Sequence, residues 1–348
     1  MKIAIDSRYL GMSGIGRVLE GILDNFDYDN YEVALVGNES LKNQYPKAKI
    51  IISNDNPFSK KGILSFPKEV NNYDCLFIPN FIIPYGIKIP VYCIVHDLIF
   101  LDMKEITTSG FIDYHLKKHL FKRCFKKSKK IFTVSNFTID RCKYYFPKYV
   151  NKLILNYPGL SKNIIEYSKT HNNLDNKDNT IIYVGNVKPH KGLDILLEAF
   201  NNINDDKYKL KIIGQKEKFL VGSTFDENKY KNVIFTGRMS DDELLEEIRN
   251  AKYLIQPSLY EGFGVPPLEA LYLGTIPILS NIPVFKEVYS NLSVVFFNTK
   301  EELTEIIKSD IKIEITPKEE LLKKYNFSIM AEKVLNTMVN ENGDNKHN

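Results

Sequence analysis

The segment Tyr253–Ala270 reads YLIQPSLYEGFGVPPLEA and contains the local pattern that decides the fold. It opens with a short apolar run, which predicts a strand that ends at Gln256, and continues into a loop that contains glycines. Two prolines then stand where a helix is expected to begin, and this helix is predicted over Pro267–Leu273. A strand, a loop and a helix in succession form the unit from which parallel α/β sheets are built.

The same alternation of short apolar runs and longer helical patterns extends along the whole chain. Besides the run at Tyr253–Gln256, strands are predicted at Lys2–Asp6, Glu32–Val36, Lys49–Ile52, Cys75–Pro79, Val91–Val95, Lys130–Val134, Thr180–Val184, Lys209–Ile213, Asn232–Phe235, Ile276–Leu279 and Val294–Phe297. Further helices are predicted at Ile15–Asn25, Ser109–Lys127, Phe137–Phe146, Leu193–Asn202, Asp241–Asn250 and Glu301–Ser309. This alternation predicts an α/β fold with parallel sheets, arranged as two doubly wound Rossmann-like domains.

A polar stretch at Ser161–Thr180 predicts a connector between the two domains, since it is rich in asparagine and has few large apolar residues after Ile165. The predicted domains are therefore residues 1–160 and 161–326. A length of 348 residues agrees with two domains of ordinary size.

The composition, with 43% hydrophobic and 26% charged residues, is that of a globular protein and excludes a disordered chain or a collagen-like one. Its apolar runs are far shorter than the roughly 20 residues that span a bilayer, and an acid as early as Asp6 argues against a signal peptide. The cysteines form no CxxC pair, and no His/Cys cluster has the spacing of metal ligands. We therefore expect reduced thiols, a cytoplasmic location and no metal site.

Charge is distributed unevenly between the two halves of the chain. Residues 1–160 contain 23 Lys and Arg against 15 Asp and Glu, whereas residues 161–348 contain 24 against 28. A basic half beside an acidic half predicts domains with different partners. The polyanions that suit the basic half are nucleic acid, a lipid surface or a phosphorylated small molecule.

Ligands of open α/β sheets bind at the carboxyl ends of the strands, so the candidate functional residues are those that follow the strands. In the first half these are Gly14, in a glycine loop after the first strand, and His96, directly after the fifth strand. The loop has no GxGxxG spacing, so a dinucleotide fingerprint is absent. Two structural alternatives stay open: the loop could only turn the chain, and His96 could be a buried structural histidine.

In the second half, Lys188 and Lys191 precede a predicted helix, where cations and backbone N–H groups together suit a pyrophosphate. The alternative is that both lysines are simply solvated. Glu261 and Glu269 flank the glycine loop of the opening segment, and Glu269 is expected in the first turn of the helix that follows. Carboxylates at such positions accept hydrogen bonds from sugar hydroxyls, as the acidic residue of dinucleotide folds does from ribose.

Taken together, these segments resemble family 4 glycosyltransferases of the GT-B fold. Glu261 and Glu269 match the family's Glu-x7-Glu motif. The resemblance covers nearly the whole chain, with matching segments at Tyr183–Phe200, Gly237–Gln256, Pro257–Val288, Ser13–Arg17, Val95–Asp97 and Val134–Thr138. The run Tyr183–Lys191 is most similar to bacterial mannosyl- and hexosyltransferases of surface polysaccharide synthesis.

The resemblance implies two Rossmann-like domains that face each other across a cleft. It also implies retaining transfer of a hexose from GDP-mannose or a UDP-sugar to a glycan acceptor, such as a lipid-linked glycan, without a metal or other cofactor. Residues 1–160, with a C-terminal helix at 327–340 that crosses back to them, would bind the acceptor. Residues 161–326 would bind the nucleotide sugar.

The resemblance also implies roles for individual residues. Glu269 would hold the ribose hydroxyls, Lys191 would neutralise the diphosphate, and Glu261 would grip the donor sugar. Gly14 would approach the phosphates, and His96 would contact the transferred sugar. The remaining donor contacts would come from the backbone of Phe263, Gly264 and Val265 and from the loop with Arg238 and Met239 around the base. Where many members carry an arginine this chain has Asn186, so either Lys188 substitutes for it or Lys191 acts alone.

The segment His115–Lys130 holds eight Lys and Arg and no acid. Its apolar residues recur at helical spacing and predict one buried face, formed by Leu116, Leu120, Phe121, Cys124 and Phe125. The helix could be a solvated one that packs on the sheet, or it could dock on an anionic membrane surface, which would make the enzyme a peripheral protein on the inner face of the membrane. Nucleic acid is not expected, because binding it would need exposed aromatic residues interleaved with the charges.

Two other functions are compatible with the same domain layout. A sugar-nucleotide epimerase or phosphorylase of GT-B shape would share the diphosphate chemistry, and it would convert the donor without an acceptor. A non-catalytic nucleotide-sugar-binding partner of another transferase would also keep the fold, although retention of His96, Lys191, Glu261 and Glu269 argues against degeneration.

Overall fold

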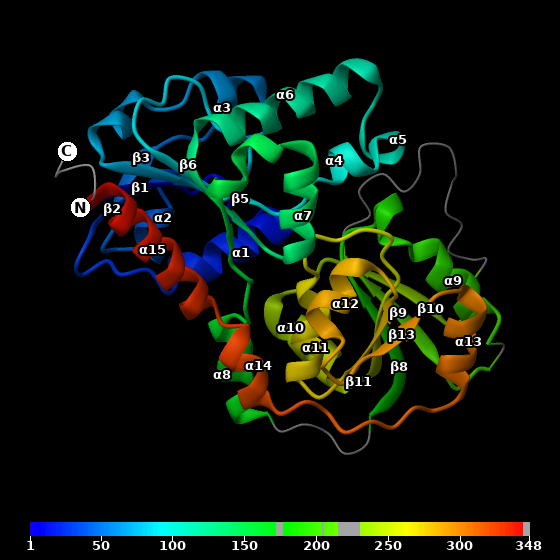
Figure 1. The fold of residues 1–348 in the computed structure, drawn as a ribbon. Helices are drawn as coiled ribbons and strands as arrows, with labels where there is room; N and C mark the ends of the chain where they lie inside the picture. Colours follow the sequence, from blue (N-terminus) through cyan, green and yellow to red (C-terminus); the bar gives the residue numbers. More distant parts are fainter. Residues whose placement is uncertain (172–176, 204, 215–229, 344–348) are drawn as a thin grey trace. The chain divides into compact units, whose positions relative to one another are not determined.

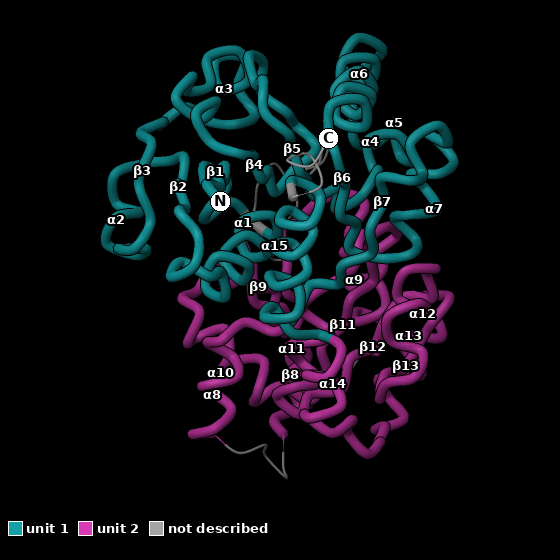
Figure 2. Tube along the Cα trace, turned by 60° about the vertical axis from the view of Figure 1, so that its left-hand side comes forward, with its two compact units in different colours: residues 1–159, 325–348 teal, residues 160–324 magenta. Residues whose placement is uncertain are grey.

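The computed structural model of the protein describes residues 1–171, 177–203, 205–214 and 230–343. The chain divides into two compact units, of which unit 1 comprises Met1–Gly159 with Tyr325–Asn348 and unit 2 comprises Leu160–Lys324 (Figure 2). Each unit is a parallel sheet with helices packed on it (Figure 1). The predicted fold class, α/β with two doubly wound domains, is confirmed.

The strands of unit 1 follow the order β3-β2-β1-β4-β5-β6-β7, and neighbouring strands are parallel. They are β1 (Lys2–Asp6), β2 (Glu32–Gly37), β3 (Lys49–Ile52), β4 (Cys75–Ile78), β5 (Val91–Val95), β6 (Ser128–Thr133) and β7 (Leu153–Leu155). Every residue of β4 and β5 is buried, because central strands of a parallel sheet are covered on both faces.

The helices of unit 1 cover both faces of this sheet. They are α1 (Ser13–Leu23), α2 (Leu41–Gln44), α3 (Lys60–Leu64), α4 (Ile99–Asp102), α5 (Lys104–Thr107), α6 (Phe111–Lys127), α7 (Asn136–Tyr145) and α15 (Phe327–Gly343), with 3-10 turns at η1 (Lys68–Asn72) and η2 (Pro147–Lys152). Helix α15, at the C-terminal end of the chain, packs on α1, and both lie on the opposite side of the sheet from α6 (Figures 1 and 2). Met330 and Val334 of α15 are completely buried, so this helix belongs to the core of unit 1.

Unit 2 has the strand order β10-β9-β8-β11-β12-β13, again with parallel neighbours. Its strands are β8 (Asp178–Val184), β9 (Lys209–Ile213), β10 (Val233–Gly237), β11 (Ala251–Gln256), β12 (Ile276–Ser280) and β13 (Val295–Phe297). Its helices are α8 (Lys162–Thr170), α9 (Leu193–Asn201), α10 (Asp241–Asn250), α11 (Val265–Tyr272), α12 (Pro283–Tyr289), α13 (Lys300–Lys308) and α14 (Lys318–Lys324), with a 3-10 turn at η3 (Pro189–Lys191). The order reverses between β8 and β11, which is where doubly wound sheets bind their ligands.

The predicted connector at Ser161–Thr180 is partly wrong. Helix α8 occupies Lys162–Thr170, the Ser161 hydroxyl caps it by accepting a hydrogen bond from the backbone N–H of Ile164, and strand β8 begins at Asp178. Residues 172–176 of the predicted connector lie outside the described residues. The helix was missed because it buries little, chiefly Ile164, and its other positions are mostly polar.

The predicted buried face of helix α6 is also partly wrong. Leu120, Phe121, Cys124 and Phe125 are buried as expected, but the side chain of Leu116 is 55% exposed. The helix ends at Lys127, and Lys129 and Lys130 belong to strand β6. Among the described residues, no helix combines the length and the apolar character that crossing a bilayer requires.

Candidate active site

The candidate site of unit 2 lies at the carboxyl ends of β8 and β11, the two strands that flank the reversal of strand order. The loop after β8 carries Lys188 and Lys191, and the loop after β11 carries Glu261. Because neighbouring strands are parallel, both loops leave the sheet at the same edge. Residues separated widely in sequence can therefore meet there.

The two loops are joined by direct contacts. The backbone N–H of Leu259 donates to the carbonyl oxygen of His190 at 2.8 Å. Gly192, with a φ of +64°, lies so close to the other loop that a Cβ atom there would come within 2.1 Å of the carbonyl oxygen of Pro257. Only glycine fits this position, which lies immediately before helix α9.

This junction brings Lys191 and Glu261 together, with the lysine Nζ 2.7 Å from Oε1 of the carboxylate. The same oxygen accepts a 2.7 Å hydrogen bond from the hydroxyl of Ser258 and a 3.4 Å contact from Nε2 of Gln256. Ser258 and Gln256 are both buried. Glu261 is thus held by three donors that converge on one of its two oxygens.

Sequence reasoning missed Ser258 and Gln256 as residues that orient Glu261. The available signal was their position in the segment QPSLYE, where β11 ends and the loop turns back toward the sheet edge.

Lys188 and Arg238, which were also predicted, are exposed, and Met239 is half-buried. Arg238 and Met239 follow β10 at the same edge of the sheet.

Burial keeps other ionisable groups near this pair neutral. It lowers the pKa of His190 to about 4, with a further contribution from the positive charge of Lys191. Burial also raises the pKa of Tyr183, and the charge of Glu261 acts in the same direction. At neutral pH, Lys191 and Glu261 therefore face a neutral imidazole and a neutral phenol.

Helix α11 begins at Val265, two residues earlier than predicted, with Gly264 as its N-terminal cap. Gly264 has a φ of +89°, and a Cβ atom there would come within 2.5 Å of the ring of Phe285, so glycine is required. The helix starts early because Pro266 and Pro267 fall in its first turn, where a missing N–H costs nothing.

The prediction that Glu269 lies in the first turn of this helix is wrong, since the helix begins before the prolines. Glu269 lies in the second turn, and its side chain is 6% exposed. The cap residue Gly264 has no side chain, and no side-chain hydrogen bond caps the helix at this residue. Pro266 and Pro267 have no N–H, so this helix start attracts an anion through its dipole more than through hydrogen bonds.

In unit 1, His96 follows strand β5 and is half-buried. Its Nε2 lies 2.8 Å from the carbonyl oxygen of Pro79, and burial lowers the pKa of the ring to about 4. A carbonyl can only accept a hydrogen bond, so in the neutral ring Nε2 carries the proton and Nδ1 is left as an acceptor. His96 is thus equipped to accept a hydrogen bond from a hydroxyl group.

Gly14, the other predicted residue of unit 1, is exposed and lies in the first turn of α1, which begins at Ser13 rather than at Ile15. No atom lies within 4 Å of a Cβ placed there, so its packing does not demand glycine. Among the described residues, no three His, Cys, Asp or Glu side chains are grouped as a metal site would need.

Comparison with known proteins agrees with this architecture. Residues 164–327 match the family model described as glycosyl transferases group 1. The O-antigen chain mannosyltransferase RfbU of Salmonella typhimurium is 28% identical over 196 residues, which are 56% of this chain and 53% of RfbU. The serotype-specific mannosyltransferase WbdA of Escherichia coli is 27% identical over 214 residues, which are 56% of this chain and 26% of WbdA. The chain thus spans about half of the first of these relatives and about a quarter of the second.

Solved structures show the same fold across nearly the whole chain. Anabaena HepE, in complex with UDP and glucose, has a TM-score of 0.68 at 15% identity, covering 97% of this chain and 99% of its own. WaaG, a glycosyltransferase involved in lipopolysaccharide biosynthesis, has a TM-score of 0.62 at 15% identity, covering 97% and 95%. Residues 164–327 therefore resemble the glycosyl transferases group 1, and the chain has the GT-B fold.

Proposed function

We propose that the protein is a retaining hexosyltransferase that moves a sugar from a nucleotide-diphosphate donor to a glycan acceptor. The observation that carries this proposal is the Lys191–Glu261 pair at the carboxyl ends of β8 and β11. A cation suits the diphosphate of a nucleotide sugar, and a carboxylate can accept hydrogen bonds from the hydroxyls of its sugar. Support for the sugar comes from the mannosyltransferase relatives, and support for a nucleotide donor comes from HepE, which was solved with UDP-glucose.

In this proposal Lys191 neutralises the charge that develops on the departing diphosphate, with Lys188 as the second cation. Preorganised charges of this kind are usually the largest single contribution to catalysis. Glu261 and the backbone of Phe263, Gly264 and Val265 bind the transferred hexose, and Glu269 binds the ribose hydroxyls. Arg238 and Met239 pack around the base.

Unit 1 binds the acceptor in this proposal and also contributes two contacts to the donor. His96 offers the lone pair of Nδ1 to a hydroxyl of the transferred sugar, and Gly14 leaves backbone accessible to the phosphates. The donor is GDP-mannose or a UDP-sugar, and the acceptor is a lipid-linked glycan of surface polysaccharide or glycolipid synthesis. The enzyme works at the cytoplasmic face of a membrane, to which helix α6 of unit 1 is attracted by its basic side chains.

Ion pairs within the protein make some of those basic side chains less available to a membrane. Lys117 is paired with Asp113, and Lys130 is paired with Glu341. Other cations of the segment are exposed, namely Lys118, Lys122, Lys126 and Lys127. The proposed contact with anionic lipid therefore relies on these four lysines.

The test is a screen for nucleotide release with UDP-, GDP- and dTDP-sugars, with and without glycan acceptors, on the wild type and on Lys191→Ala. Acceptor-dependent release from one donor class, with product of unchanged anomeric configuration, is the expected result. Conversion of the donor to an epimer without any acceptor would instead identify an epimerase. Binding of a donor without turnover of any acceptor would identify a non-catalytic partner.

A further inference from the structure

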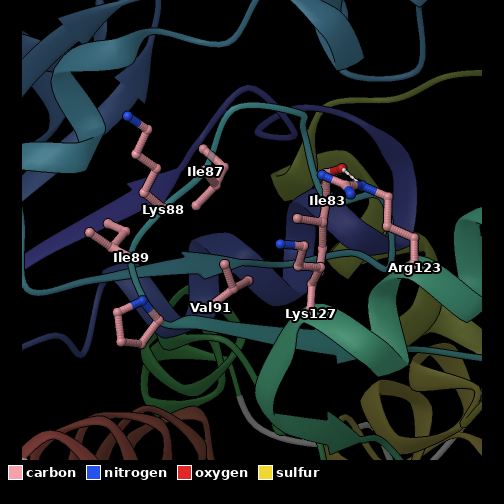
Figure 3. Close-up of a pocket in the computed structure, with 8 residues that line it drawn as sticks. Ile83, Ile87, Lys88, Ile89, Val91, Arg123 and Lys127 are labelled. Atoms are coloured by element: carbon pink, nitrogen blue, oxygen red, sulfur yellow. Dashed lines mark hydrogen bonds between the residues drawn. The ribbon is translucent and has the colours of Figure 1, made fainter.

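Unit 1 contains a cavity of about 270 Å³ near the amino end of strand β5, whereas His96 lies at the carboxyl end of the same strand. Its wall includes Val91, the first residue of β5, whereas His96 follows the last residue of that strand. The other lining residues come from the segment before β5 and from the C-terminal half of α6, namely Ile83, Ile87, Lys88, Ile89, Pro90, Arg123 and Lys127 (Figure 3). The cavity is therefore separate from the residues assigned to sugar transfer.

All the charged residues that line this cavity are basic. Lys88, Arg123 and Lys127 are among the eight lining residues, and none of the eight carries a carboxylate. Arg123 and Lys127 lie at one side of the cavity, whereas the amino group of Lys88 points away from them (Figure 3). Lys88 is exposed, so its side chain can change rotamer and turn toward them, and three cations then suit a single anionic group such as a phosphate.

Arg123 is held in place before any ligand arrives. Its Nε and Nη2 donate to the carbonyl oxygens of Ile83 and Pro84 at 3.2 and 2.9 Å, and its guanidinium carbon lies 3.9 Å from the ring centre of Tyr85. Its remaining N–H groups are still available for an anion, because a guanidinium has five donors. A fixed guanidinium loses little side-chain entropy when it binds.

Lys127 is also free to serve a ligand. The last carbonyls of α6 would normally attract the cations of the final turn. Here the Nζ of Lys152 donates to the carbonyl oxygens of Phe125, Lys126 and Ser128, so another residue already satisfies this end of the helix. The side chain of Lys127 extends toward the isoleucines of the cavity (Figure 3).

The rest of the lining is aliphatic, with Ile83, Ile87, Ile89 and Val91 beside the cations. A ligand that fits both parts has one anionic group next to hydrocarbon. A free phosphate would leave the aliphatic wall without a partner. A phospholipid, whose phosphate adjoins its glycerol and acyl chains, matches both parts of the lining.

The exposed face of α6 continues from this cavity to an apolar end. Phe111, Ile112 and Leu116 are 78%, 83% and 55% exposed, and they lie at the opposite end of the same helix from Lys127. A helix of 17 residues is about 25 Å long, and its solvent side presents hydrocarbon in the first two turns and cations farther along. Amphipathic surfaces of this kind bind in the interface of an anionic bilayer.

We propose that the cavity between residues 83–91 and α6 binds the phosphate of an anionic phospholipid, with Lys88, Arg123 and Lys127 as its cations. In this proposal the basic residues of α6 attract the protein to an anionic membrane, and the cavity in addition binds one lipid molecule. This inference rests on the membrane contact of the proposed function, but not on the transfer chemistry.

The first experiment measures binding of a soluble lipid. The chain contains no tryptophan, so Tyr85→Trp places a single fluorescent reporter beside Arg123 and keeps an aromatic ring under the guanidinium. This variant is titrated with dihexanoyl phosphatidylglycerol below its micelle concentration, with dihexanoyl phosphatidylcholine and with inorganic phosphate. Saturable binding of phosphatidylglycerol alone is expected. Equal binding of inorganic phosphate would overturn the assignment to lipid, and a lack of saturation with every ligand would overturn the site.

The second experiment compares two double variants with the same loss of charge, each made in the reporter background. Lys88→Gln with Lys127→Gln removes two cations of the cavity, and Lys118→Gln with Lys122→Gln removes two exposed cations of α6 outside it. We expect the cavity pair to weaken binding of the soluble lipid about 30-fold, from two lost charge contacts, and the control pair to change it less than twofold. Equal losses in both pairs would mean diffuse attraction and no specific site.

Co-sedimentation with vesicles separates this inference from the proposed function. If anionic vesicles still bind through α6 while the soluble lipid does not bind, the cavity proposal fails and the membrane contact stands. If nucleotide release with a water-soluble acceptor is absent while the soluble lipid binds, the proposed transferase fails and the cavity proposal stands.

Discussion

Replacing Glu261 by glutamine should tighten the binding of a free nucleoside diphosphate, even though it removes a residue assigned to the active site. Lys191 is held by the Glu261 carboxylate at 2.7 Å. A diphosphate that binds Lys191 must therefore compete with this carboxylate. Glutamine removes the competing charge, and its amide oxygen can still accept the hydrogen bond from Ser258.

The size of the effect follows from how exposed the pair is. The side chains of Lys191 and Glu261 are 21% and 10% exposed, so the pair is worth more than most surface pairs, or about 1 kcal/mol. Since about 1.4 kcal/mol corresponds to a tenfold change in affinity, the dissociation constant should fall about fivefold. The amide cannot reproduce the carboxylate's contacts with the sugar, so turnover should fall at the same time.

Isothermal titration with GDP and UDP measures the affinity, and nucleotide release measures turnover. The matched control is Glu269→Gln, which should weaken nucleotide binding because this residue is assigned to the ribose. Adding Lys191→Ala to Glu261→Gln should abolish the gain in affinity. Unchanged or weaker nucleoside diphosphate binding by Glu261→Gln alone would refute the idea that Lys191 is shared between the carboxylate and the diphosphate.

The other predictions concern catalysis, pH and packing. Lys191→Ala should lower turnover about 100-fold in the nucleotide-release assay, as for the loss of one preorganised charge contact; near-normal turnover with an unchanged circular dichroism spectrum would contradict the diphosphate assignment. In the folded state the pKa of His96 and of His190 is about 4, below the ordinary value of 6.5. Below pH 6.5 the unfolded chain therefore binds more protons than the folded one, and the free energy of unfolding should fall as the pH drops toward 4. Urea unfolding should show a shallower fall for His96→Gln than for the wild type, and identical slopes would count against a buried neutral ring. Met330→Ala, at a completely buried position of α15, should cost about 2–5 kcal/mol of unfolding free energy, and a loss below 1 kcal/mol would mean that α15 is only loosely packed.

Buried strands were the most predictable part of the fold. The predicted bounds of β1, β5 and β9 agree with the structure residue for residue, because runs such as Val91–Val95 are apolar throughout and end at polar residues. The bounds of β3 were also correct, although it is an edge strand in which only Ile51 is buried. Strand β7 was missed because it has only three residues, Leu153–Leu155, and so short an apolar run does not indicate a strand.

The position of the site was predictable, but its internal contacts were not. The rule that ligands bind at the carboxyl ends of strands pointed to the loops with Lys191 and Glu261. That the two side chains form an ion pair depends on how these loops meet, through Gly192 and the hydrogen bond from Leu259 to His190. Such contacts between loops far apart in sequence leave no periodic signal in the chain.

Helix α6 shows why spacing alone misjudges burial. Leu116 lies four residues before Leu120, so helical geometry places both on nearly the same face. Leu120 is buried and Leu116 is exposed, because the buried residues of α6 all lie in its C-terminal half. Spacing determines which way a side chain points, whereas burial also requires another element beneath it. The helix therefore presents apolar residues to solvent in its first two turns and exposed lysines from Lys118 to Lys127, and this combination, more than the count of charges, is what suits α6 to the surface of an anionic membrane.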